Sequence, residues 1–336
     1  MDDELRALLA RLPVADADAE AAVRRRAAEV LRPVGALARL DEVAAWLAGW
    51  QRSARPGVER PGVIVFVAEH GVADEGVSAY PGSVTAEMLR ALRAEVATAA
   101  VMARTTGATF GVVDVGVGRP SANLVREPAL SRDRFRWCFA AGRQAVTDLV
   151  AEGAPDVLVL GEMGIANTTA AAAVCATLFG GPAEDWTGRG TGIDDATLTR
   201  KTAVVDAARR RITDDDPGPF EVLRQVGGPD LVALAGATLE ARRRSIPIVL
   251  DGFVVSAAVA PLDVARPGAL DHCLAGHCSG EPGHRLLLDK LGKAPLLDLG
   301  LRLGEASGAL AALPLVKLAA ACVTEVATFG EWGIPR

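Results

Sequence analysis

The sequence predicts an α/β protein in which helices cover a mainly parallel sheet. Half of the 336 residues are apolar and only 4% are aromatic, so Ala, Val and Leu form most of the predicted core. Short β-branched runs without polar alternation are typical of strands that are buried on both faces. Each run is followed by a polar, glycine-rich stretch and then by a helical pattern, which is the element order of parallel α/β folds.

Helices form the first predicted element. Residues 1 to about 50 show helical periodicity, with leucines from Leu5 to Leu12 on one face. Residues 51–61 are rich in proline and glycine and read as a linker. We therefore expect the first segment to be a helical cap or part of a smaller domain.

Four strands and their connecting helices follow. The clearest strand is the unbroken run at residues 63–68, and similar runs occupy residues 110–118, 156–160 and 247–250. Helical patterns are found at residues 84–104, 140–151, 170–178, 204–211, 231–242, 254–259 and 310–329, the last of them interrupted at Pro314.

Charge and cysteine content narrow the function classes. The net charge of −6 predicts no general attraction to nucleic acid or to an anionic membrane. Five cysteines, an odd number, and the absence of a secretory leader indicate a reducing cytoplasm. The longest apolar run, residues 246–260, contains Pro247, Asp251 and Gly252, so we expect no membrane span.

Two loops at predicted strand ends are candidates for a binding site, because ligands of parallel sheets bind outside the carboxyl ends of strands. Residues 69–81 follow the first strand and carry His70 and the only tyrosine, Tyr80; an ordinary surface loop remains the alternative. Residues 161–169 follow the third strand, with glycines that allow close backbone approach and with Asn167 at a helix start. They indicate a phosphate or ribose cradle or a plain capped turn, with Glu162 pointing into the same crevice.

Two further stretches suit an anionic ligand. Residues 185–195 contain alternating glycines with an arginine and threonines, and Lys201 lies on the following helix; a flexible connection is the alternative. Asp251, at the end of the fourth strand, either accepts hydrogen bonds from a ribose or caps the next helix.

Residues 272–284 combine three histidines and two cysteines. The pairs His272/Cys273 and His277/Cys278 are each adjacent in sequence, and their spacing fits neither a Cys-x2-Cys knuckle nor His-Glu-x2-His. We therefore expect no metal site. The alternative is a second anion loop around Ser279 and Gly280.

Glu305 stands out near the end of the chain. Arg302 and Glu305 are the only charged residues between Asp298 and Lys317. A helix begins directly afterwards, so its positive end is expected to keep the carboxylate ionised. An ionised carboxylate in apolar surroundings acts as a base or stabilises a cationic transition state, and a helix-capping acid is the alternative.

Taken together, six stretches resemble the nicotinate-nucleotide:dimethylbenzimidazole phosphoribosyltransferases, a family of cobalamin lower-ligand synthesis. They occur in family order at residues 69–81, 161–169, 188–192, 251–253, 279–284 and 302–305. The resemblance implies a Rossmann-like domain at residues 61–300 and a smaller helical domain built from residues 1–60 and 301–336. It also implies a homodimer without metal or organic cofactor, which transfers phosphoribose from nicotinate mononucleotide to 5,6-dimethylbenzimidazole and releases nicotinate and α-ribazole 5′-phosphate.

The resemblance also implies residue roles. Glu305 would be the base that deprotonates the azole, and Glu162 the second acid, near the ribose. The nucleotide and its phosphate would be bound by Gly164, Asn167, Gly190, Lys201, Asp251, Ser279 and Gly280, and the azole would be enclosed by Ser78, Tyr80 and Leu303. Glu69, Ala166 and Cys278 depart from the residues usual in the family, which leaves the base preference open.

Two alternatives remain. The first is the same reaction with another acceptor, such as adenine, another benzimidazole or a phenol. The second is a non-catalytic module that binds a nucleotide or an azole; the presence of both Glu162 and Glu305 argues against it.

Overall fold

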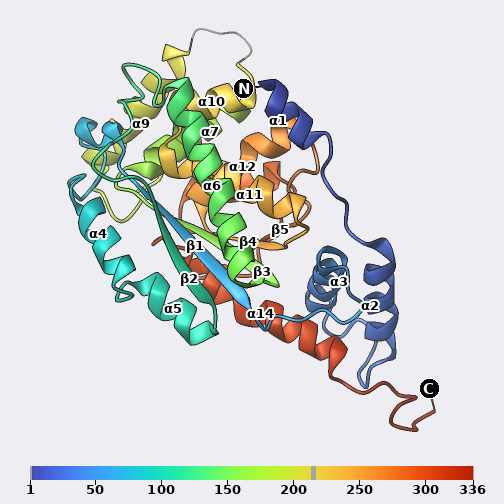
Figure 1. The fold of residues 1–336 in the computed structure, drawn as a ribbon. Coiled ribbons are helices and arrows are strands. Elements are labelled where there is room, and N and C mark those ends of the chain that lie inside the picture. Colours follow the sequence, from blue (N-terminus) through green and yellow to red (C-terminus); the bar gives the residue numbers. More distant parts are fainter. Residues whose placement is uncertain (1, 213–216, 336) are drawn as a thin grey trace.

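One parallel sheet forms the centre of the fold (Figure 1). The computed structural model describes residues 2–212 and 217–335. The strands are β1 (Pro61–Ala68), β2 (Thr109–Gly116), β3 (Val157–Met163), β4 (Ile248–Leu250) and β5 (Cys273–Ala275), in the order β2-β1-β3-β4-β5 with every neighbouring pair parallel. The strand order reverses between β1 and β3, and this topological switch point is where open α/β sheets bind ligands. The predicted α/β class is confirmed.

Alternate side chains of β1 enter two separate cores. Val63, Val65 and Val67 pack into one core, whereas Ile64 and Phe66 pack into the other. Because successive side chains of a strand point to opposite faces, a strand covered on both sides needs apolar residues at every position. This explains the unbroken apolar run in the sequence.

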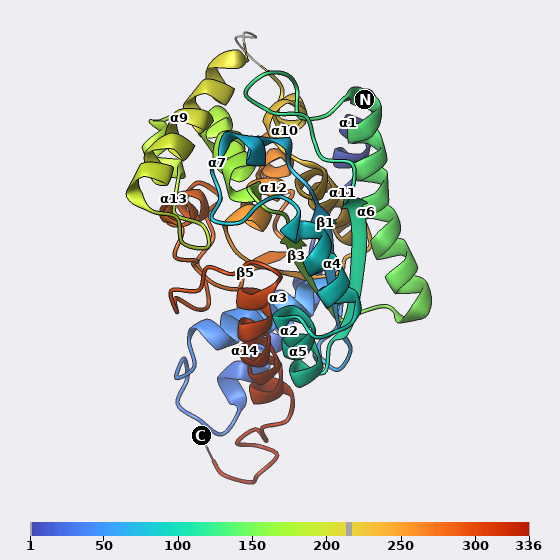
Figure 2. The ribbon, with the colours of Figure 1, turned by 90° about the vertical axis from the view of Figure 1, so that its left-hand side faces the viewer.

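Most helices cover one face of the sheet (Figures 1 and 2). Next to the strands lie α6 (Arg132–Gly153), α11 (Pro229–Arg243) and α12 (Phe253–Ala265), and α7 (Asn167–Phe179) packs against α12. Farther out on this side are α1 (Asp2–Leu9), α8 (Ala183–Trp186), α9 (Asp195–Arg211), α10 (Pro219–Val226) and α13 (Pro282–Lys290).

Both ends of the chain contribute to the other face, where α4 (Val84–Arg93), α5 (Thr98–Thr106) and α14 (Ser307–Thr324) cover the sheet. The helices α2 (Ala17–Glu29) and α3 (Arg39–Gln51) pack against α14, as Figure 1 shows. Arg26 Nε donates to Val323 O at 2.8 Å, which ties α2 to the end of α14. The domain boundaries at residues 60 and 300 stay a prediction.

Three details of the predicted element list are wrong. Residues 84–104 form two helices, because Glu95 adopts a left-handed backbone (φ +56°) between α4 and α5. Pro314 does not interrupt α14, since packing on both sides of this buried helix outweighs the hydrogen bond that proline cannot donate. The strand β5 and the helices α8, α10 and α13 were not predicted. Three residues are too few to show a strand periodicity, and helices of four, eight and nine residues are too short to show a clear helical one.

Within the described residues, α14 is the one helix that is long and apolar enough to cross a membrane. More than half of it is buried in the protein, where it packs against β3, β4, α3 and α5. Core helices of this kind meet the same criteria of length and composition. All five cysteines are free thiols.

Candidate active site

Two buried carboxylates meet at the switch point of the sheet. Glu162 is at the carboxyl end of β3 and is 6% exposed, while Glu305, in the turn before α14, is 4% exposed. The Glu305 N–H donates to the Glu162 carbonyl oxygen at 3.2 Å. Between them, Gly304 lets the Glu162 carboxylate come close, because a Cβ at Gly304 would lie 2.7 Å from Glu162 Oε1. The two predicted catalytic residues therefore belong to one site.

The backbone around Glu305 is strained. Glu305 (φ +57°) and Ala306 (φ +68°) are consecutive non-glycine residues in the left-handed region, which costs roughly 1–2 kcal/mol for each. Strain of this kind persists where the surrounding structure holds it and is common at functional sites. Close packing against β3 keeps Glu305 and Ala306 in this conformation, since a Cβ at Gly161 of β3 would lie only 2.5 Å from the Ala306 nitrogen.

The Glu305 side chain is only partly hydrogen-bonded. The Ala99 N–H, in the first turn of α5, lies near its carboxylate and favours the ionised form. Its Oε2 atom is buried without a hydrogen-bond partner among the described residues. The first turn of α14, which the sequence assigned to Glu305, instead donates the N–H groups of Gly308 and Ala309 to Asp251 Oδ1 at 2.7 and 3.0 Å.

The pKa of Glu305 shifts upward, which is opposite to the shift that a helix end alone would produce. Burial raises the pKa of Glu305, and the charge of Asp251 adds to the rise, whereas the Ala99 N–H lowers the pKa by less. Burial, with the charges of Asp230 and Asp251, also raises the pKa of Glu162 well above its usual value. Desolvation therefore dominates, and it makes each ionised carboxylate a stronger base than an exposed one.

A row of buried polar groups continues from Glu162. The Asn167 amide Nδ2 donates to Glu162 Oε2 and lies 3.3 Å from Asp230 Oδ2. His70 Nε2 is 2.9 Å from Asp230 Oδ1, within ion-pair distance although not aligned as a hydrogen bond. This row of side chains connects the loop after β1 with the carboxyl end of β3 and with the start of α11. The sequence places His70 in a candidate loop, but it does not identify Asp230, whose only local signal is its place at a helix start after two glycines and a proline.

Two positions near Asn167 show why this loop is rich in small residues. Ala166 precedes α7 with φ +73°, a conformation that favours glycine. A Cβ at Gly164 would lie 2.7 Å from Ala68 O and 3.0 Å from the His70 ring. Gly164 therefore lets β1 and the loop after β3 approach closely enough to place His70 and Asn167 in one row.

We expect Gly304→Ala to reduce turnover at least about 100-fold, because the new methyl group would displace Glu162 Oε1 from the pair of carboxylates. Gly300→Ala is the matched control, since Gly300 has a similar left-handed backbone (φ +66° against +84°) and no atom within 4 Å of the added Cβ. Steady-state rates and thermal melting separate the two effects. Equal loss of activity in both variants would mean that backbone strain alone is responsible.

Lys201 is the cation of the predicted phosphate subsite, and it is buried. Its Nζ donates to Thr168 Oγ1 at 2.8 Å and to Gly188 O at 2.9 Å. Gly190 is next to it, because a Cβ there would lie 3.7 Å from Lys201 Nζ. The Gly190 N–H donates to Glu281 Oε1 at 2.7 Å, and Glu281 Oε2 has no hydrogen-bond partner among the described residues. Glu281, which sequence reasoning did not select, is thus the acid closest to this subsite.

The loop around Ser279 is held by a neutral histidine. The Ser279 N–H donates to His284 Nδ1 at 2.9 Å, so this nitrogen carries no proton and Nε2 donates to Ser256 Oγ at 3.1 Å. Burial lowers the pKa of His284 to about 3, in agreement with this assignment. The Gly280 N–H already donates to Leu301 O at 2.8 Å. The backbone of Gly280 therefore connects this loop to the stretch that carries Glu305.

The residues expected to enclose the azole are less buried. Tyr80 is 52% exposed, Leu303 is 45% exposed and Ser78 is intermediate. Leu303 precedes Gly304 and is therefore next to the carboxylate pair. Ser78 Oγ accepts from the Tyr80 N–H at 3.3 Å, and within the described residues no hydrogen bond joins either of them to Glu162 or Glu305. Their role stays a prediction.

The histidines and cysteines of residues 272–284 do not form one cluster, although the rings of His277 and His284 pack edge-on with centroids 5.9 Å apart. His272 packs edge-on against Trp50 and lies 3.2 Å from Thr238 O, whereas His277 Nε2 is 3.7 Å from Asp251 Oδ1. In the described part of the chain, no group of three or more His, Cys, Asp or Glu side chains is placed to hold a metal ion.

Comparisons with known proteins agree with one another. A family model described as "Phosphoribosyltransferase" matches residues 12–334. The nicotinate-nucleotide–dimethylbenzimidazole phosphoribosyltransferase of Cereibacter sphaeroides is 46% identical over 98% of this chain and 96% of its own, and that of Brucella anthropi is 44% identical over 99% and 96%. The crystal structure of CobT from Thermus thermophilus superposes with a TM-score of 0.90 at 42% identity and covers 95% of this chain and 99% of its own.

Proposed function

This chain belongs to the nicotinate-nucleotide–dimethylbenzimidazole phosphoribosyltransferase family, and from that membership we propose that it transfers phosphoribose from nicotinate mononucleotide to 5,6-dimethylbenzimidazole. The products are α-ribazole 5′-phosphate and nicotinate, which places the enzyme in cobalamin nucleotide-loop synthesis. The observation that carries the proposal is the pair of buried carboxylates at the switch point, in which Glu305 Oε2 has no partner among the described residues.

Glu305 acts as the base in this reaction. The azole nitrogen lone pair attacks C1′ of the ribose, the bond from C1′ to the pyridinium nitrogen breaks, and its electrons return to the nicotinate ring. Nicotinate needs no proton to leave, because the positive ring nitrogen becomes neutral. The azole N–H proton is the one that must be removed, and a buried carboxylate of raised pKa accepts it readily. Attack opposite the leaving group turns a β-nucleotide into an α-product.

Glu162 supports the same step from the other side of Gly304. Its negative charge, when ionised, stabilises the positive charge that develops on the ribose ring. Asn167 orients this carboxylate, Asp230 accepts a hydrogen bond from Asn167, and His70 lies against Asp230. We assign these three residues to positioning rather than to contact with the reacting atoms.

Lys201 binds the 5′-phosphate, with Ser279 and the loop of Gly190 beside it. Its two hydrogen bonds, to Thr168 and Gly188, leave one ammonium proton for the ligand. Asp251 is buried beside His277, and its Oδ2 has no hydrogen-bond partner among the described residues, so this atom is available to a ribose hydroxyl.

A panel of acceptor bases tests the proposed reaction. The protein is incubated with nicotinate mononucleotide and with 5,6-dimethylbenzimidazole, unsubstituted benzimidazole, adenine or a phenol, and free nicotinate and product mass are measured. We expect the highest kcat/KM with 5,6-dimethylbenzimidazole. A higher kcat/KM with adenine or a phenol would replace the acceptor but keep the reaction, and no turnover with any base would favour a non-catalytic binding module.

We also propose that the enzyme is a cytoplasmic homodimer, with α2, α3 and α14 forming a small domain at the meeting of the two chain ends. The five free thiols suit a reducing compartment. The ties between Arg26 and the end of α14 support a unit built from distant segments. Sedimentation equilibrium of the purified chain tests the dimer, and a monomeric mass at working concentration would exclude it.

A further inference from the structure

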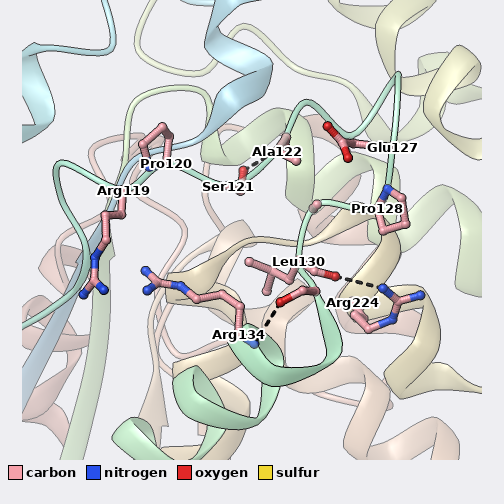
Figure 3. A pocket seen from close by; sticks show the side chains of 11 residues that line it. Arg119, Pro120, Ser121, Ala122, Glu127, Pro128, Leu130, Arg134 and Arg224 are labelled. Carbon is pink, nitrogen blue, oxygen red and sulfur yellow. Dashed lines mark hydrogen bonds between the residues drawn. The ribbon is translucent and has the colours of Figure 1, made fainter.

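A cavity of about 500 Å³ lies at the carboxyl end of β2 (Figure 3). Its walls come from the loop between β2 and α6, from the first turn of α6, and from Arg224 of α10. None of its lining residues belongs to the site around Glu162 and Glu305 or to the subsite of Lys201. It is therefore a separate candidate for ligand binding.

Two arginines at one side of this cavity share a single aromatic partner. The guanidinium carbon of Arg134 lies 4.6 Å from the centroid of the Trp137 ring, and that of Arg119 lies 5.8 Å from it. Figure 3 shows the two arginine side chains pointing toward one another, one from the loop and one from α6. Both cations are thus held at the same place, although like charges repel.

No carboxylate neutralises these two cations in the described part of the chain. Arg134 donates to a neutral acceptor, Val115 O, at 2.6 Å, and Arg119 has no hydrogen-bond or ion-pair partner there. Arg224, in contrast, is neutralised by Glu221. Glu127 also lines the cavity, but Figure 3 shows it on the side opposite Arg119.

The remaining walls define the kind of anion that fits. Pro120, Pro128 and Leu130 supply apolar surface, and the volume is that of a small-molecule site. Two guanidinium groups offer forked donors that match the oxygens of a phosphate. The positive end of α6, which starts after its N-cap Ser131, adds to the potential.

We propose that this cavity binds a phosphate monoester, with Arg119 and Arg134 on the phosphate and the organic part against the proline and leucine side chains. The loop is also tied to the active-site side of the sheet, because the Ser121 N–H donates to Glu69 O at 3.0 Å and Ser121 Oγ accepts from the Gly71 N–H at 3.2 Å. Glu69 and Gly71 are the chain neighbours of His70. The loop that forms the cavity is therefore hydrogen-bonded to the segment that carries His70, the first member of the row leading to Glu162.

Trp137 offers a probe that is specific to this cavity. The chain has five tryptophans, so protein labelled with 5-fluorotryptophan gives resolvable ¹⁹F signals that Trp→Phe variants assign. Trp186 reports separately on the Lys201 subsite, because its backbone lies against Gly283 in the first turn of α13, which follows the Ser279 loop. The full-length protein is titrated with ribose 5-phosphate, with inorganic phosphate, and with ribose as the uncharged control.

We expect ribose 5-phosphate to shift the Trp137 signal saturably and ribose to leave it unchanged. In R119Q/R134Q the apparent Kd for ribose 5-phosphate should rise at least about tenfold, because one or more charge-assisted hydrogen bonds to the phosphate are lost. R126Q/R136Q is the matched control, because it removes the same charge from the same loop and the same helix without touching the cavity. Arg119→Gln alone changes an exposed side chain without hydrogen bonds, so it tests the site even if the double variant folds poorly.

The proposal would be overturned by a Trp137 signal that does not respond to ribose 5-phosphate, by an equal response to ribose, or by a response that survives unchanged in R119Q/R134Q. A response to inorganic phosphate but not to the ester would overturn the monoester assignment. A shift of the Trp186 signal alone would place the phosphate in the Lys201 subsite and would likewise count against a second site.

Discussion

Glu305→Gln is expected to lower kcat by about 10²- to 10⁴-fold, the usual contribution of a positioned general base. Glutamine keeps the size of the side chain but cannot take the azole proton. Nicotinate mononucleotide should bind with nearly unchanged affinity, because the contacts proposed for its phosphate are made by Lys201 and the Ser279 loop, not by Glu305. Product formation followed by chromatography, together with calorimetric titration of the nucleotide, measures both effects.

The matched control is Glu325→Gln, which removes an exposed carboxylate at the opposite end of α14 and should leave kcat unchanged. Glu305→Asp provides a second check, because it keeps the base and withdraws it by one methylene. We expect it to retain more activity than the glutamine variant. Full activity of Glu305→Gln would disprove the role assigned to this residue, whatever the acceptor base.

Lys201→Met is expected to raise the KM for nicotinate mononucleotide by about 10- to 100-fold, because a charge-assisted hydrogen bond to the phosphate is lost. The same lysine predicts a pH dependence. Burial lowers its pKa to about 8, and the nearby Glu281 offsets only part of this. Above that pH the ammonium loses its proton, so KM should rise as pH increases through about 8 in the wild type and stay flat in the variant.

Nicotinate riboside, which lacks the phosphate, separates binding from folding in this experiment. Wild type and Lys201→Met should use it at similar rates, since neither can form the phosphate contact. Lys290→Met, an exposed change at the end of α13, serves as the control for loss of a positive charge. An equal loss of activity with riboside and mononucleotide would show that Lys201 holds the fold rather than the phosphate.

The row His70–Asp230–Asn167–Glu162 shows where prediction from the sequence ended. His70 was recognised because it follows a clear strand, and Asn167 because it starts a helix after a glycine-rich loop. Asp230 was missed, since an acid at a helix start is usually a cap and nothing local distinguishes it. Only the packing of α11 against β1, β2 and β3 brings it to His70.

The sequence by itself determined the parallel sheet, the strand ends that carry Glu162 and Asp251, and the identity of Glu305 as an acid in an apolar stretch. These features depend on local patterns, because a strand buried on both faces needs an unbroken apolar run and a loop at its end needs polar and small residues. The tertiary structure alone decided that α5 rather than α14 brings a backbone N–H near Glu305, and that burial raises the pKa of Glu305. The position of α5 beside Glu305 and the burial of Glu305 both depend on contacts between residues about two hundred positions apart. The packing of α5 and α14 on one face of the sheet creates these contacts, and no local sequence pattern encodes them.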